Sequence, residues 1–180
     1  MQVLTGRKKK ANEEIIEQVI LENYNQYYRL AYSYVHNEED AGDIVQNGAY
    51  KALRSSHTLR SQEYAKTWVY RIMLNEIFSF LKQPRVESYD QMQEERGNPG
   101  EYAEDAYADI DLQRALDSLT PEDKAIVEMK YFEERKLEEI AEILDENVNT
   151  VKSRLYRSIR KLREKLEERP VKKESGKGIV

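Results

Sequence analysis

The sequence predicts an all-α protein in which two small helical domains are joined by a flexible acidic linker. Apolar residues recur with the spacing of amphipathic helices over most of the chain. Long alternating apolar and polar runs are absent, so no pair of such runs is joined by a hairpin turn. Between the two groups of helical segments, acids gather and large aliphatic residues are few. The 180 residues suffice for one domain of ordinary size or two small ones.

Three helices are predicted in the first domain, residues 13–84. Pro84 ends the third helix, because proline cannot continue a helix. The sequence SSHTLRS between the second and third helices indicates a loop. The predicted helices span about residues 13–35, 39–54 and 62–82. Residues 1–12 precede this domain and are predicted to form a disordered tail.

An acidic linker is predicted over residues 85–108. Between Glu87 and Asp109 the only base is Arg96, and such a segment buries too little apolar surface to order itself alone. The second domain follows over residues 109–169. It holds four helical segments, of which the second has Thr120 as its expected N-cap and proline at its first helical position. A disordered tail is predicted over residues 170–180.

Positive charge is concentrated in the last helical segment, although the protein carries a formal net charge of −5. The stretch NTVKSRLYRSIRKLREKL, from Asn149 to Leu166, holds one acid, Glu164. Its bases are Lys152, Arg154, Arg157, Arg160, Lys161, Arg163 and Lys165. One side of this helix is apolar and is expected to pack inward. The inward residues are Val151, Leu155, Ile159, Leu162 and Leu166.

A helix-turn-helix motif is predicted from the short helix KLEEIAEIL, the turn DENVN and the basic helix that follows. The second helix of such a motif enters the major groove of DNA with its N-terminal residues at the base edges. A basic helix can also be merely a solvated surface. The scarcity of acids on this helix and the acidity of the rest of the chain favour DNA binding.

Two stretches resemble bacterial sigma-70-type factors. ALDSLTPEDKAIVEMKYFEERKLEEIAEILDENVNTVKSRLYRSIRKLREKL is similar to region 4 of that family. YYRLAYSYVHNEEDAGDIVQNGAYKAL, followed by TWVYRIMLNEIFSFLK, is similar to region 2. The two regions in this order, joined by a short linker, resemble the group IV or extracytoplasmic function (ECF) sigma factors. The resemblance covers about Tyr24 to Leu166 and implies a region 2 helical bundle and a region 4 helix-turn-helix.

This resemblance implies a sigma factor that directs RNA polymerase in promoter recognition and transcription initiation. Region 4 would read the −35 element as duplex, and each wrong base pair there would weaken binding by about 1–3 kcal/mol. The base-edge and near-base positions implied are Lys152, Ser153, Tyr156 and Arg157. The phosphate positions implied are Arg154, Arg160 and Lys161.

Region 2 of the family captures the −10 element as melted single strand. Here the loop between Ser55 and Glu63 resembles the loop that receives a flipped-out base. The implied loop positions are Ser55, Ser56, His57, Thr58, Leu59 and Arg60. The implied positions on the following helix are Arg71, Asn75 and Lys82. Trp68 on that helix is expected to belong to the core rather than to a wedge in DNA.

The resemblance also implies protein partners. Asp43, Gln46 and Asn47 match the segment that docks on the clamp helices of the largest polymerase subunit. The flap of the second subunit, promoter DNA and an anti-sigma factor are the other implied partners. No cofactor is implied.

Other classes of function remain alternatives at this point. A helix-turn-helix regulator would bind duplex DNA without being a polymerase subunit, and a helical adaptor would bind only protein. An enzyme is not expected, because the sequence shows no phosphate loop, no catalytic triad spacing and no metal-ligand cluster. There is no cysteine and no stretch of about 18 apolar residues. We therefore expect a cytoplasmic protein without membrane insertion.

Overall fold

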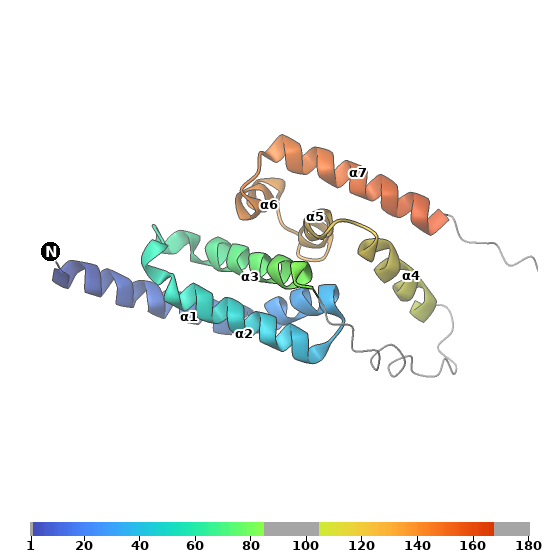
Figure 1. Ribbon diagram of the computed structural model, residues 1–180. Coiled ribbons are helices and arrows are strands. Elements are labelled where there is room, and N and C mark those ends of the chain that lie inside the picture. Colours follow the sequence, from blue (N-terminus) through green and yellow to red (C-terminus); the bar gives the residue numbers. More distant parts are fainter. Residues whose placement is uncertain (1, 85–104, 168–180) are drawn as a thin grey trace, which may run out of the picture.

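The computed structural model describes residues 2–84 and 105–167, and all regular secondary structure in these residues is helical (Figure 1). The α-helices are α1 (Gln2–Val35), α2 (Glu38–Arg54), α3 (Ala65–Lys82), α4 (Asp105–Asp117), α5 (Pro121–Tyr131), α6 (Leu137–Leu144) and α7 (Val148–Glu167). Two single-turn 3₁₀ helices, η1 (Ser56–Thr58) and η2 (Gln62–Tyr64), lie between α2 and α3. The all-α prediction is confirmed. Most of the predicted linker and the predicted C-terminal tail lie outside the described residues.

The first domain is a bundle of α1, α2 and α3, which lie side by side (Figure 1). The inward faces follow the helical spacing of the sequence, with Ile44, Val45 and Met73 each about 1% exposed. At Gly48, the backbone of α2 approaches α3 so closely that a Cβ atom would collide with the sulfur of Met73. Glycine is therefore required for this helix pair to pack at its observed separation.

The N-terminal helix begins at Gln2, so the predicted disordered tail over residues 1–12 is wrong where the structure describes it. The reason is visible at Asn12, which is only 2% exposed. Its side-chain amide donates hydrogen bonds to the backbone oxygens of Ser56 (2.9 Å) and Leu59 (3.0 Å). These bonds attach the first part of α1 to the loop between α2 and α3. A polar side chain gave no sign of this burial in the sequence.

The start of α3 is also later than predicted, at Ala65 rather than near residue 62. Residues 62–64 form η2 instead. The segment predicted as a loop therefore contains two short turns of 3₁₀ helix, whose hydrogen bonds span three residues and rarely continue beyond one turn.

The second domain contains the four predicted helices. Its first helix starts at Asp105, so the linker boundary predicted at residue 108 is a few residues too late. The predicted cap of α5 is confirmed, because the hydroxyl of Thr120 accepts a hydrogen bond from the backbone N–H of Asp123 (3.2 Å) and Pro121 opens the helix. This cap satisfies a backbone donor that would otherwise have no partner.

The turn between α6 and α7 is short and well bonded. Asp145 ends α6 in the left-handed conformation (φ 56°), and the backbone N–H of Glu146 donates to the oxygen of Ala141 (2.9 Å). The side chain of Asn147 then accepts from the backbone N–H of Asn149 (2.8 Å), which supports the first turn of α7. The predicted helix-turn-helix is thus present.

The inward face of α7 is shorter than predicted. Val151, Leu155 and Leu162 are buried, but Leu166 in the last turn is 37% exposed. Ser158 occupies a buried position, and its hydroxyl donates to the backbone oxygen of Arg154 (2.8 Å). Ile159 is only half-buried. Sequence periodicity continues along a helix regardless of how far its packing partners extend, so it overestimated the buried length.

The two domains pack against each other in this structure. Helices α5 and α6 lie between the first-domain bundle and α7 (Figure 1). The closest approach between helices of the two domains is made by α3 and α6. The outer face of α7 is therefore turned away from the first domain.

Candidate nucleic-acid interface

The outer face of α7 carries most of the basic residues predicted to contact duplex DNA. Val151 (0% exposed) and Leu155 (6%) anchor the opposite side of the helix against the second-domain core. Because that side is fixed, the outer side chains are presented on a rigid element. The exposed candidates are Lys152, Ser153, Tyr156, Arg157, Arg160 and Lys161. This placement agrees with the predicted recognition helix.

Arg154 differs from the other α7 candidates. Its guanidinium donates to Asp123 (Nε to Oδ1, 2.7 Å) and forms a short ion pair with Glu146, and its side chain is only 17% exposed. Burial opposes the charge, but the hydrogen bond and attraction of Asp123 prevail and raise the pKa of Arg154. The residue therefore joins α7 to α5 and to the turn of the motif, which is a structural role that the phosphate assignment did not foresee.

Two exposed residues were not among the sequence candidates. Asn149 and Thr150 lie in the first turn of α7 and face solvent. The N-terminal residues of a recognition helix are those nearest the base edges. The general geometry of the motif could have identified them, had the start of the helix been fixed at Val148.

The loop between α2 and α3 presents only part of its predicted surface. Ser56 (0% exposed) and Leu59 (2%) are buried, because their carbonyls receive the Asn12 amide and their side chains pack inward. Ser55 is half-buried. The exposed loop candidates are His57, Thr58 and Arg60. The buried pair fixes the loop, so the three exposed side chains are held at a defined edge of the bundle.

Helix α3 presents its candidates in two different ways. Asn75 and Lys82 are exposed. Arg71 instead donates from Nε to the backbone oxygen of Ile143 (3.1 Å) and from its terminal nitrogen to that of Glu142. These oxygens lie at the C-terminal end of α6, where unpaired carbonyls favour a positive charge. Arg71 is thus engaged with the second domain.

Trp68 is half-buried and packs against the hydrophobic core. The expectation that it belongs to the core is confirmed for this structure.

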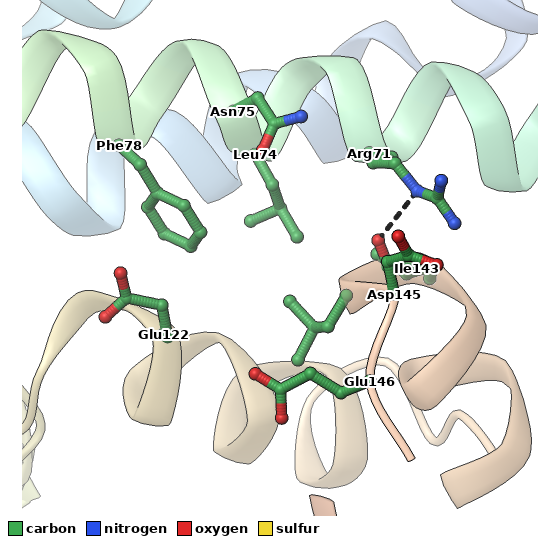
Figure 2. Close-up of a pocket in the computed structure, with 9 residues that line it drawn as sticks. Arg71, Leu74, Asn75, Phe78, Glu122, Ile143, Asp145 and Glu146 are labelled. Carbon is green, nitrogen blue, oxygen red and sulfur yellow. Dashed lines mark hydrogen bonds between the residues drawn. The ribbon is translucent and has the colours of Figure 1, made fainter. Parts of the chain in front are cut away.

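A cleft of about 320 Å³ lies between α3 and the second domain. Arg71 and Asn75 line it on the side of α3, and Glu122, Asp145 and Glu146 line it on the other side (Figure 2). The acidic side would repel a nucleic-acid phosphate. In this arrangement, Arg71 and Asn75 face protein carboxylates rather than open solvent alone.

A separate polar surface lies on α2. Asp43, Gln46 and Asn47 are exposed at positions that share one side of the helix, and Ile44 and Val45 point to the core. The structure thus brings together the three residues predicted to bind polymerase. They lie on a different helix from every DNA candidate.

Two further searches cover only the described parts of the chain. Residues 2–84 and 105–167 contain no group of three His, Asp or Glu side chains placed to hold a metal ion. Among the helices of these ranges, none combines the length and the apolar character required to span a membrane.

Comparison with known families agrees with the two domains. The model of sigma-70 region 2 matches residues 19–86, and the model of sigma-70, region 4 matches residues 109–162. Solved structures of similar fold include CnrH in complex with the cytosolic domain of CnrY (TM-score 0.65, 18% identity, 92% of this chain and 96% of that chain). The sigma factor RpoE in complex with the anti-sigma factor NepR, from Bartonella quintana, has a TM-score of 0.63 with 23% identity over 86% of this chain and 98% of its own.

Two curated relatives are more similar in sequence. RNA polymerase sigma factor SigV of Bacillus subtilis is 43% identical over 158 residues, which cover 87% of this chain and 94% of the relative. ECF RNA polymerase sigma factor SigE of Mycolicibacterium smegmatis is 31% identical over 83% of this chain and 61% of its own length. The chain belongs to the sigma-70 family, as an RNA polymerase sigma factor of the ECF group.

Proposed function

We propose that this sigma factor reads the −35 promoter element as duplex with the outer face of α7. It holds the melted −10 strand with α3 and the adjoining loop. The observation that carries the proposal is the exposed basic face of α7, opposite Val151 and Leu155, which anchor the helix in the core. A rigid helix with an undiluted basic face suits the major groove.

The −35 contacts are divided by position along α7. Asn149, Lys152 and Ser153 lie toward the N-terminal end, where side chains reach base edges, and Tyr156 and Arg157 follow on the next turn. Arg160 and Lys161 lie further along the helix and contact phosphates. Arg154 is assigned to holding the motif together through Asp123 and Glu146.

The −10 contacts are assigned to residues that are exposed or become exposed. His57, Thr58 and Arg60 form the edge that receives a flipped base, and Asn75 and Lys82 follow the strand along α3. Flipping a base out of the stack costs a few kcal/mol, which a shaped pocket recovers. Arg71 joins this surface only when it leaves the carbonyls of α6.

Polymerase docking is assigned to Asp43, Gln46 and Asn47 on α2, which face the clamp helices of the largest subunit. The second domain meets the flap of the second subunit. With both domains bound to one polymerase, binding at either promoter element raises the effective concentration at the other. Free sigma factor is therefore expected to bind promoter DNA weakly.

An anti-sigma factor is also proposed as a partner. The solved structure of RpoE holds the anti-sigma factor NepR, and that protein shares the fold of this chain. The proposal places this chain in the cytoplasm, where core polymerase and DNA are found. The protein has no catalytic role in this account, because its contribution is binding and positioning.

The test is transcription in vitro by core polymerase on a library of genomic fragments, with and without this protein. New start sites sharing sequence elements near −35 and −10 would support the proposal and give the consensus. Tight binding to duplex DNA by the protein alone, without new starts, would favour a regulator that acts without being a polymerase subunit.

A further inference from the structure

We propose that the free protein is closed by a polar latch between its two domains, which must open before both promoter elements can be bound. The latch consists of Tyr34 and Tyr70 on the first domain, Lys124 and Glu133 on the second, and Arg71, which reaches across to α6. This inference rests on the proposed function of α3 and α7.

Lys124 on α5 is the most deeply buried part of the latch. Its side chain is only 3% exposed, and lysine is rarely buried unless it is paired. The ammonium donates to the backbone oxygen of Ser33 in α1 (2.5 Å) and to Asp117 Oδ1 (2.7 Å). It also lies over the ring of Tyr34, 4.7 Å from the centroid. The charge is therefore neutralised within its own domain but is covered and hydrogen-bonded by the first domain.

Two tyrosines of the first domain complete the covering. The hydroxyl of Tyr34 donates to the backbone oxygen of Pro121 (3.1 Å), and the hydroxyl of Tyr70 donates to Glu133 Oε1 (2.6 Å). The guanidinium of Arg135 lies over the ring of Tyr70 at 4.4 Å and is paired with Glu133 at 2.7 Å. Tyr70 is 0% exposed, so its hydroxyl ends in a second-domain ion pair that excludes water.

Arg71 connects the latch to DNA binding. It is bound to the last carbonyls of α6, so it is not free to contact the melted −10 strand. Asn75 lines the same cleft against the acidic side formed by the second domain (Figure 2). Closing the latch therefore withdraws part of the −10 surface.

The spacing of the promoter elements makes the closed form incompatible with binding both. Elements at −35 and −10 lie about 25 base pairs apart, which is about 85 Å of duplex at about 3.4 Å per base pair. In the closed form, α3 and α6 are joined by a hydrogen bond of 3.1 Å, and α7 packs directly on α6. A 20-residue helix such as α7 is only about 30 Å long. The two DNA surfaces must separate to reach both elements.

The chemistry of the latch suits a reversible closure. Its contacts are hydrogen bonds and ion pairs rather than a continuous apolar seam, and polar domain interfaces permit relative motion. Docking of α2 and the second domain on two separate sites of core polymerase would hold the domains apart. We infer that core polymerase is the partner that opens the latch.

The experiment follows the distance between the domains by fluorescence energy transfer. The chain has no cysteine, so Glu17→Cys on α1 and Arg163→Cys on α7 give one labelled position in each domain at exposed sites. The expected result is high transfer in the free protein and low transfer after core polymerase is added. Low transfer in the free protein, or no change when polymerase binds, would overturn the latch.

A variant pair tests the hydrogen bonds. Tyr34→Phe with Tyr70→Phe keeps both rings but removes two interdomain donors, and should raise the open fraction about tenfold or more. The control is Tyr50→Phe with Tyr131→Phe, since these tyrosines are 63% and 57% exposed and lie one in each domain. Equal transfer in the two variants, with helical content preserved in both, would contradict the proposal.

A reversible crosslink tests whether opening is required. His36 and Asp117 face each other across the domains (3.1 Å) and are partly exposed, so His36→Cys with Asp117→Cys can be joined by a short disulfide-forming crosslinker. The joined protein should lose transcription with core polymerase and regain it on reduction, and each single-cysteine variant treated alike should stay active. Full activity while joined would overturn the latch. Absence of transcripts from the unmodified protein would instead refute the proposed function, and the energy-transfer measurement on the free protein does not depend on that result.

Discussion

The buried carboxyl of Glu128 gives a prediction whose size follows from the structure. Glu128 lies on α5 at the domain interface and is 7% exposed. Burial raises its pKa from 4.5 to about 7, although the ammonium of Lys124, 4.0 Å away, opposes this shift. Ser33 and Tyr34 of α1 donate toward the carboxylate, and Glu133 adds a like charge from the loop after α5.

The direction of the pH effect follows from this raised pKa. The folded protein binds the proton of Glu128 more tightly than the unfolded chain, so the contribution to stability is full below pH 4.5. It is lost as the pH rises through about 7. The difference between the two pKa values corresponds to about 3 kcal/mol, at about 1.36 kcal/mol per pKa unit. Asp117 has a lowered pKa, so its own effect falls below this pH window.

Glu128→Gln removes the titration while keeping the shape of the side chain. We expect its free energy of unfolding, relative to the unmodified protein, to increase by about 2.5 kcal/mol between about pH 5 and about pH 8. Urea denaturation followed by circular dichroism at several pH values measures this difference. Glu138→Gln, at an exposed site of the same domain, controls for the loss of one negative charge.

A difference between Glu128→Gln and the unmodified protein that stays constant with pH would refute the reasoning. So would a variant that becomes relatively less stable at high pH, because burial could then not be the dominant influence on this carboxyl.

Three further predictions follow from single contacts. Asn12→Ala should lower the free energy of unfolding by about 1–3 kcal/mol, because it leaves two buried carbonyls without a donor; thermal denaturation beside the exposed control Gln18→Ala would measure this. Arg154→Met should destabilise the second domain and weaken −35 binding without reducing its salt dependence, since the side chain is paired internally; a reduced salt slope would show phosphate contact instead. Lys161→Ala should reduce the slope of log affinity against log salt by about 1 for −35 duplex, and an unchanged slope would remove it from the phosphate contacts.

Helical periodicity predicted the bundle because each helix buries one regular face. Ile44, Val45, Val151 and Leu155 were placed correctly by spacing alone. The cap at Thr120 was also predictable, since it depends on residues adjacent in sequence. Local patterns therefore determined most of the fold within each domain.

Long-range polar contacts could not be predicted in this way. Asn12 is buried by bonds to a loop more than 40 residues later, and Lys124 is buried by an entire second domain. Neither residue has a pattern in its own helix that distinguishes it from a solvated one. The same limitation explains why Arg71 and Arg154 were assigned to DNA although the structure engages both with protein.

The most direct test of the account is a combined footprint of one open complex on a promoter that the protein activates. The account predicts that the −35 element is protected as duplex, while thymines around −10 react with permanganate as unpaired bases. Lys152→Ala with Arg157→Ala should weaken protection at −35, and Asn75→Ala should reduce the unpaired signal at −10 while leaving −35 protection intact. Unchanged protection at −35 in the α7 variant would contradict the assignment of that helix to the duplex. An equal loss at both elements in the Asn75 variant would contradict the division of the promoter between the two domains.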